Sequence, residues 1–190
     1  MVTVGIDEVG RGCWAGPLVA GAVILPEPLL LSDECQLRDS KKLSAKQREK
    51  AAVWLDAHAT AIGLGWVTSA EIDKLGLTES VRLAYVRALE GIAAEYDEII
   101  IDGNINYLSD NPKARAIVKA DDSVPCVSAA SIAAKVARDA YMTKISSTYT
   151  GYGFELHVGY GTAAHLAALK KYGPTDIHRL SYRPIKALGL

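Results

Sequence analysis

A short run of β-branched residues constrains the fold of this chain more than any other feature. Ile99–Ile101 contains no polar residue, and Asp102 and Gly103 follow it directly. An uninterrupted apolar run of this kind is typical of a strand that is buried on both faces. The run therefore predicts an interior strand of an α/β protein, with a carboxylate where the strand stops.

The rest of the chain shows strand and helix patterns in alternation. Strands are expected at 2–8, 18–25, 61–67, 99–103 and 116–118, and helices at 45–58, 79–96, 126–147 and 162–172. Ser44 can cap the first helix, and the polar residues 33–42 before it are expected to form a loop. A length of 190 residues suits one domain with a small appendage.

Two adjacent carboxylates, Asp7 and Glu8, close the first predicted strand. Such a pair needs a cation to neutralise it. Gly10, Arg11 and Gly12 come next, and they suit phosphate because glycine lets a backbone approach a ligand and arginine adds a positive charge. Adjacent strand residues point to opposite faces, so both acids can reach one cation only if the strand ends or bulges there. The two glycines favour such a bend.

Asp102 and one of Asp121 or Asp122 extend the set to four carboxylates. Hard cations such as Mg²⁺ take oxygen ligands, and two ions about 3.5–4 Å apart can activate a water and stabilise a leaving oxygen. Taken singly, Asp102 could merely start a turn, and either later aspartate could merely cap a helix. Their joint placement favours a metal site for phosphoryl chemistry.

The predicted helix 126–147 carries a polar face. Ser128, Ser131 and Lys135 lie at i, i+3 and i+7. Hydroxyls and an ammonium near a helix N-terminus can hold a phosphate. Close helix packing would explain the serines equally well, but it does not explain Lys135.

Composition bounds the function and the compartment. The formal charge of −1 and the pI near 6.4 give no global sign of nucleic-acid binding, so a polyanion would have to meet the local basic patches at 38–50 and 170–186. Cys13, Cys35 and Cys126 lack the spacing of a disulfide framework or a structural zinc site. With no export signal or membrane span in the pattern, we expect a soluble, cytoplasmic protein without a membrane partner.

Six blocks of sequence occur in an order that matches one known family. They are Gly5–Gly12 with Ala15–Pro17, Asp39–Leu43, Ile101–Gly103, Val127–Asp139, Gly159–Thr162 and His178–Tyr182. One block alone would be a weak signal, but the ordered set covers nearly the whole chain. The chain closely resembles ribonuclease HII, the type 2 ribonuclease H.

The resemblance implies a ribonuclease H-like mixed β-sheet flanked by helices over residues 1–150. A small C-terminal helical extension, over 151–190, would contribute to substrate binding as part of one compact unit. The match prefers Asp121 to Asp122, because Lys119 and Ala120 stand before it where the family has a lysine and a small residue. The implied catalytic and metal-binding acids, which would hold two Mg²⁺ or Mn²⁺ ions, are Asp7, Glu8, Asp102 and Asp121.

The same resemblance implies the substrate contacts. Gly10–Gly12 corresponds to the family's junction-reading loop, and Tyr160 corresponds to its ribose-sensing tyrosine. Leu180 and Tyr182 stand where arginine and phenylalanine are common, which removes one cation from the tail. The implied phosphate contacts are Lys41 or Lys42, Ser128, Ser131 and Lys135.

The implied activity is that of an endoribonuclease. It would hydrolyse the phosphodiester 5′ to a ribonucleotide, in RNA/DNA hybrids and at ribonucleotides embedded in duplex DNA, and so help to remove ribonucleotides from DNA. No histidine base is needed when the nucleophile is a metal-activated water. We expect His165 to be structural and His178 to support docking of the tail.

Two alternative functions and two expectations about assembly complete the interpretation. A DNA nuclease or integrase of the same fold could use the four acids but would not need Gly10–Gly12 and Tyr160. A non-catalytic nucleic-acid-binding module would not need all four acids. We expect a monomer and, because the chain stops at Leu190, no C-terminal clamp-binding peptide.

Overall fold

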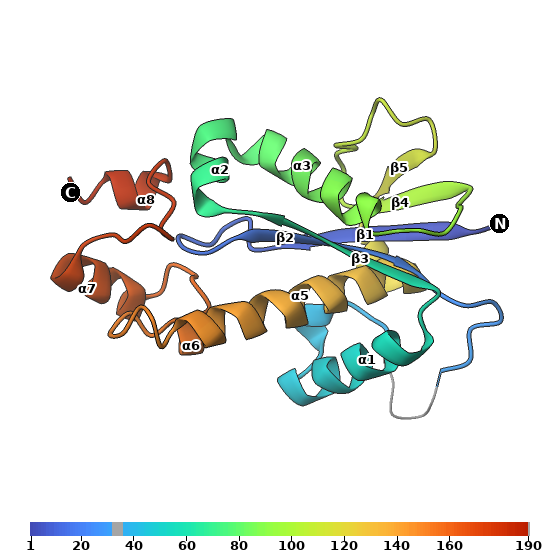
Figure 1. Cartoon of the computed structure of the whole chain (residues 1–190), viewed down its shortest axis with the longest axis horizontal. Coiled ribbons are helices and arrows are strands. Elements are labelled where there is room, and N and C mark those ends of the chain that lie inside the picture. The colour runs from blue at the N-terminus through green and yellow to red at the C-terminus, as the bar shows by residue number, and fades with distance from the viewer. Residues whose placement is uncertain (32–35, 190) are drawn as a thin grey trace.

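A five-stranded mixed sheet forms the centre of the computed structural model, which describes residues 1–31 and 36–189 (Figure 1). The strand order is β3-β2-β1-β4-β5. β1 pairs antiparallel with β2 and parallel with β4, while β2–β3 is antiparallel and β4–β5 is parallel. The expected mixed sheet is confirmed. The strands are β1 (Thr3–Val9), β2 (Leu18–Ile24), β3 (Ala61–Val67), β4 (Glu98–Asp102) and β5 (Ala114–Ile117).

Helices cover both faces of the sheet (Figure 1). α3 (Leu77–Glu90) lies on one face, and α5 (Pro125–Ile145) lies on the other with α1 (Ala45–His58) packed beside it. α6 (Phe154–His157), α7 (Ala163–Tyr172) and α8 (Arg183–Lys186) gather beyond the end of the sheet that is far from the N-terminus. The remaining helices are η1 (Ser40–Lys42), α2 (Ser69–Leu75) and α4 (Ala120–Ser123).

The isoleucine run in β4 is buried on both faces, as predicted. Ile99 and Ile101 join the core under α3 together with Val4, whereas Ile100 packs on the opposite face with Cys126. This alternation follows from the pleat of the strand. β4 is therefore an interior strand, and Asp102 is the residue at its carboxyl end.

Two glycines let α5 lie unusually close to the sheet. A Cβ on Gly5 in β1 would stand 2.2 Å from the backbone carbon of Cys126, and one on Gly21 in β2 would stand 2.4 Å from the carbonyl oxygen of Ala130. Any larger residue at either position would push the helix away. The close contact brings the polar face of α5 against the acidic end of β1.

The helix predicted at 79–96 is wrong at its C-terminal end. α3 stops at Glu90, and Gly91 follows as its C-cap. Ile92 still packs into the core, but from the loop, so its apolar spacing imitated another helical turn. The other predicted elements agree with the structure to within two residues at each end.

Several short elements were not predicted. α2 begins after Thr68, whose hydroxyl and Glu71 form a capping box, so the signal was present in the sequence. The expected loop at 33–42 contains the short helix η1, and its residues 33–35, with Cys35, lie outside the described residues. Cys13 and Cys126 are buried free thiols. Across the described parts of the chain, none of the helices has the length and apolar character needed to cross a bilayer.

Candidate active site

Asp7 and Asp102 lie side by side on neighbouring parallel strands. Ile6 pairs with Ile101 in the β1–β4 register, so the two aspartates follow at the same level. Both point to the face covered by α5, where Asp7 is only 6% exposed and lies near the hydroxyl of Ser131. The sheet thus places two carboxylates side by side toward the carboxyl ends of two interior strands.

Asp121 adds a third carboxylate at the start of α4. Its backbone N–H donates a 3.2 Å hydrogen bond to Oδ1 of Asp102, and Nζ of Lys41 lies 3.9 Å from its Oδ2. The next residue, Asp122, points away and forms a 2.7 Å ion pair with Lys42 on the exposed surface. Of the two aspartates that the sequence left open, it is Asp121 that faces Asp102.

Glu8 lies on the opposite face of β1. The register continues through Glu8 to Val9 without a bulge, so the bend expected at Asp7 and Glu8 is wrong. The carboxylate of Glu8 accepts a hydrogen bond from the hydroxyl of Tyr85 on α3 and a 3.1 Å hydrogen bond from Nη1 of Arg11. The structure therefore brings Asp7, Asp102 and Asp121 together and holds the side chain of Glu8 apart from them.

The electrostatics of the three converging acids favour a bound cation. Burial raises the pKa of Asp7 well above its ordinary value, and the charges of Glu8 and Asp102 raise it further. Burial and Asp102 likewise raise the pKa of Asp121. Carboxylate oxygens from β1, β4 and α4 form the kind of donor set that Mg²⁺ and Mn²⁺ accept. Within the described residues, however, no group of three or more Asp, Glu, His or Cys side chains is arranged so that it could hold a metal ion as it is.

The serines of α5 lie beneath the acids. Ser128 is 1% exposed and donates a 2.7 Å hydrogen bond to the backbone carbonyl of Asp121. Ser131 contacts Asp7, and its Oγ lies 2.9 Å from Oγ of Ser40. In this structure both serines support the carboxylates, and their contact with a substrate phosphate stays a prediction.

The candidate phosphate-binding lysines lie at the rim of the site. Lys41 and Lys42 are exposed and pair with Asp121 and Asp122, as described above. Lys135, two turns along α5 from Ser128, pairs with Asp139 at 2.8 Å. Its Nζ stands 5.8 Å from the ring centroid of Tyr160. Lys135 therefore accompanies Tyr160 instead of the converging carboxylates.

The loop 10–12 leaves β1 directly beside these acids. Gly10 has φ of +92°, and a Cβ there would stand 2.4 Å from Nε of Arg138, so the position requires glycine. A Cβ on Gly12 would meet nothing within 4 Å, which leaves the outer side of the loop open. Arg11 between them donates to Glu8 and, at 3.1 Å, to the hydroxyl of Tyr107.

The C-terminal segment brings Tyr160 to this loop. The backbone N–H groups of Trp14 and Ala15 donate to the carbonyl of Gly159, at 2.8 and 3.3 Å. The Tyr160 side chain is 40% exposed, and its hydroxyl lies near the thiol of Cys13. Tyr160, the residue predicted to sense ribose, thus lies beside Cys13, the residue that directly follows the glycine loop.

Sequence reasoning missed several residues that support the site. Tyr85 looked like an ordinary core residue of a helix, since nothing in its spacing reveals a carboxylate partner on a distant strand. Arg138 and Arg179 are fully buried and donate to backbone carbonyls of the segment 11–17. The signal for these arginines was their place inside the family-like blocks of sequence. Ser40 was likewise present in such a block without a role.

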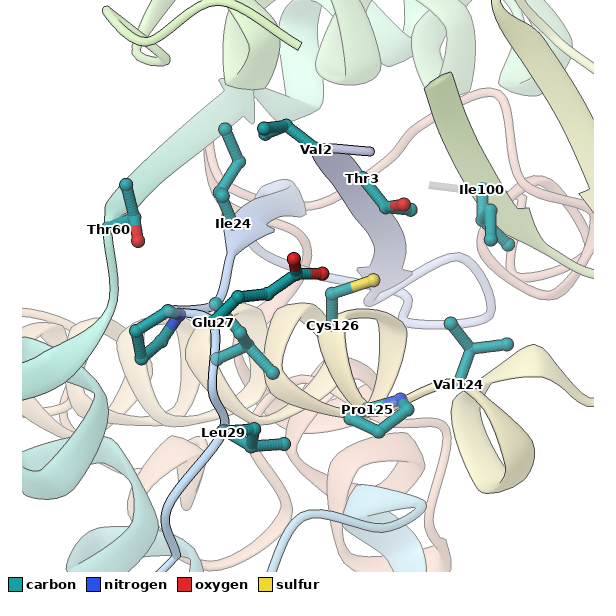
Figure 2. A pocket seen from close by; sticks show the side chains of 12 residues that line it. Val2, Thr3, Ile24, Glu27, Leu29, Thr60, Ile100, Val124, Pro125 and Cys126 are labelled. Carbon is teal, nitrogen blue, oxygen red and sulfur yellow. The ribbon is translucent and has the colours of Figure 1, made fainter. Parts of the chain in front are cut away.

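An apolar pocket of about 360 Å³ lies elsewhere in the molecule (Figure 2). It is lined by the start of β1, the end of β2 and the N-terminus of α5, and the side chains of Glu27 and Cys126 extend into it (Figure 2). None of the four predicted acids lines this pocket. Its apolar walls do not suit a polyanion, so the acidic edge of the sheet remains the candidate site.

Comparison with known proteins identifies the family of this chain. The family model for ribonuclease HII matches residues 4–185. Ribonuclease HII of Nitrosococcus oceani is 46% identical over 182 residues, which cover 96% of this chain and 89% of that protein. The protein of the same name from Halorhodospira halophila is 44% identical over 188 residues, or 97% of this chain and 93% of that one.

A solved structure extends the agreement to the fold. The ribonuclease H2 from Pyrococcus horikoshii OT3 has a TM-score of 0.82 at 29% identity, covering 99% of this chain and 97% of that one. The sheet order, the acids at its edge and the matching relatives lead to one conclusion: this chain is a nuclease that belongs to the ribonuclease HII family.

Proposed function

We propose that this protein is an endoribonuclease that hydrolyses the phosphodiester 5′ to a ribonucleotide, leaving 5′-phosphate and 3′-hydroxyl ends. Its substrates are RNA/DNA hybrids and duplex DNA with embedded ribonucleotides, and its role is to remove ribonucleotides from DNA. The observation that carries the proposal is the position of Tyr160, whose neighbour Gly159 bonds to the backbone of Trp14 and Ala15, just beyond the loop 10–12 and the acidic end of β1.

Asp7, Asp102 and Asp121 would hold the metal ions, with Glu8 as the fourth carboxylate of the proposed set. The raised pKa values of Asp7 and Asp121 support this assignment, because a divalent cation relieves the burial and mutual repulsion that cause them. Two Mg²⁺ or Mn²⁺ ions held there would supply activation of the attacking water and stabilisation of the leaving 3′ oxygen. Ser131 and Ser128 hold Asp7 and the backbone of Asp121 in place for them.

Recognition of the ribose falls to the loop 10–12 and Tyr160. A ribonucleotide differs from a deoxyribonucleotide only by its 2′-hydroxyl, so an enzyme that selects it must hydrogen-bond that group at close range. The open side of Gly12 lets backbone groups approach the sugar. Tyr160 offers its hydroxyl to the same ribose, while its ring packs against the neighbouring sugar, where a second 2′-hydroxyl would crowd it.

The test compares three duplexes that differ only in sugar: one embedded ribonucleotide, an RNA/DNA hybrid, and DNA alone. With Mg²⁺ or Mn²⁺, the first two are expected to be cut on the 5′ side of a ribonucleotide, and the third is expected to remain intact. EDTA is expected to abolish cleavage. Cleavage that survives the chelator would refute the metal mechanism, and equal cleavage of the DNA duplex would favour a DNA nuclease.

A single substitution separates catalysis from binding. Asp102→Asn keeps the Oδ1 that accepts from the N–H of Asp121 but removes the charge, so duplex binding is expected to persist while cleavage is lost. Asp56→Asn, at an exposed acid of α1, is the matched control and should cut like the parent. Unchanged cleavage by Asp102→Asn would refute the assignment of this acid.

A further inference from the structure

A chain of hydrogen bonds through two buried histidines ends on the backbone of Tyr160. The N–H of Thr175 donates to Nδ1 of His178 at 2.8 Å, and Nε2 of His178 lies 3.1 Å from Nε2 of His165. Nδ1 of His165 in turn lies 2.9 Å from the carbonyl oxygen of Tyr160. His165 is 0% exposed and His178 is 1% exposed. The chain therefore runs through the interior of the C-terminal extension.

The two ends of this chain determine where the protons lie. Nδ1 of His178 accepts the N–H of Thr175, so neutral His178 carries its proton on Nε2. That proton points at Nε2 of His165, which must accept it. His165 then carries its own proton on Nδ1 and donates it to Tyr160. Every bond in the chain is satisfied when both rings are neutral and have opposite tautomers.

An added proton would break the chain at one of its joints. On Nδ1 of His178 it would displace the bond from the N–H of Thr175 and leave only the Thr175 hydroxyl, 2.9 Å away, as an acceptor. On Nε2 of His165 it would set one N–H against that of His178. Burial lowers the pKa of His165 and of His178 to about 4, and the two rings also disfavour each other's charge. The titratable groups around the pair include His157, stacked on His165 at 4.6 Å, and Tyr152 and Asp176 near His178.

The segment that carries Tyr160 needs such anchors. Val158, two residues before it, has φ of +43°, a strained conformation for a β-branched residue. Nη1 of Arg138 donates to the carbonyl of Val158 at 2.8 Å, and the N–H of Tyr160 donates to the carbonyl of His157 at 2.9 Å. The carbonyl of Tyr160 accepts from the N–H of Thr162 at 2.9 Å and from Nδ1 of His165 at 2.9 Å, and this second bond ties the Tyr160 backbone to the buried pair.

We propose that His165 and His178 are positioning residues that hold Tyr160 for the reading of the ribose. This proposal rests on the function proposed above for Tyr160. The pair acts through the backbone of Tyr160 and takes no part in proton transfer to the substrate. A packing role alone would require apolar surface from the two rings, but not their opposite tautomers.

The first test examines the unmodified protein. Two-bond ¹H–¹⁵N NMR of the imidazoles at pH 7 should show His165 neutral with its proton on Nδ1, and His178 neutral with its proton on Nε2. An imidazolium at either position, or the same tautomer at both, would overturn the proposal. This measurement needs no substrate, so its result does not depend on the activity assigned to Tyr160.

The second test is a double-mutant cycle on a duplex with one embedded ribonucleotide. His165→Leu should lower kcat/KM roughly tenfold or more, since the Tyr160 carbonyl loses its side-chain donor and keeps only the N–H of Thr162. His165→Asn should restore most of the loss, because an amide can donate from near the position of Nδ1. In a Tyr160→Phe background, His165→Leu should have little further effect.

His58→Leu is the matched control, because Nδ1 of His58 makes a similar 2.8 Å contact to the carbonyl of Trp54 on α1, and it should cut like the parent. An equal loss from His165→Leu with and without the Tyr160 hydroxyl would overturn the positioning role. If Tyr160→Phe itself cuts like the parent, the proposed function of Tyr160 fails, whatever tautomers the histidines show. Should His165→Leu not fold, the NMR result decides the proposal.

Discussion

The guanidinium of Arg179, in the segment before α8, donates a 3.0 Å hydrogen bond from Nη1 to the backbone carbonyl of Arg11, in the loop that follows β1. Its Nε and Nη2 both donate to the carbonyl of Gly16, at 3.1 and 2.9 Å. The hydroxyl of Tyr182 donates to the same Arg11 carbonyl at 2.6 Å. The end of the chain thus fixes the loop that leaves the acidic strand.

Replacing Arg179 should therefore destabilise the whole protein. Arg179→Met leaves the carbonyls of Arg11 and Gly16 with fewer donors in a buried site, so we expect the free energy of unfolding to fall by about 3 kcal/mol. Urea unfolding measures this change. Arg115→Met removes a largely exposed pair with Glu98 and should change stability by less than about 1 kcal/mol. Similar losses in the two variants would contradict the structural role of Arg179.

The sequence predicted the parts of the fold that depend on local pattern. The isoleucine run identified β4 as an interior strand, and Ser44 identified the start of α1 through its cap. The end of α3 could not be predicted in the same way, because Ile92 keeps helical spacing while packing from a loop. Local patterns do not distinguish an apolar residue on a helix from one that follows it.

The site depended on contacts between distant segments. Asp7 and Asp102 meet because β1 and β4 are neighbours, a pairing that no local feature of either strand specifies. The separation of Glu8 from them follows from the unbroken pleat of β1 and from Tyr85 on α3. The resemblance to a family supplied the residues, but the structure supplied which carboxylates face one another.

Asp7 should cost the metal-free protein stability at neutral pH. Its pKa is raised in the folded state, so the stability that it contributes is fully present below its ordinary pKa near 4 and is lost as pH rises toward the folded value. In EDTA, Asp7→Asn should therefore be more stable than the parent by about 2 kcal/mol at pH 8, and by less at pH 5. Urea unfolding at both pH values measures the difference. A difference that does not change with pH would contradict the raised pKa.

The buried histidines should give an acid-dependent loss of stability. The pKa of His165 and of His178 is about 4 in the folded protein and near 6.5 when unfolded. The stability that the two neutral rings contribute is therefore fully present above pH 6.5. As pH falls toward 4, the free energy of unfolding decreases by up to about 1.4 kcal/mol per pH unit for each ring. The stability gap between the parent and His165→Leu, from urea unfolding at pH 7, 6 and 5, should narrow on acidification. A constant gap would show that His165 titrates normally in the folded state.

The two glycines of the loop 10–12 should respond differently to the same substitution. Gly10→Ala forces a side chain into a left-handed position against Arg138, so it should lower the free energy of unfolding by about 1–3 kcal/mol. Gly12→Ala places its methyl group in open space and should leave stability within about 0.5 kcal/mol of the parent. Thermal unfolding of both variants checks this contrast.

The same Gly12→Ala variant tests the approach of the loop to the substrate. If backbone groups at Gly12 reach the ribose, the added methyl group holds the sugar away, and cleavage at a single ribonucleotide should fall roughly tenfold or more. Because the fold is expected to stay intact, the loss should appear with an unchanged melting temperature. Parent-like cleavage by Gly12→Ala would instead mean that the ribose is read from elsewhere, with Tyr160 as the remaining candidate.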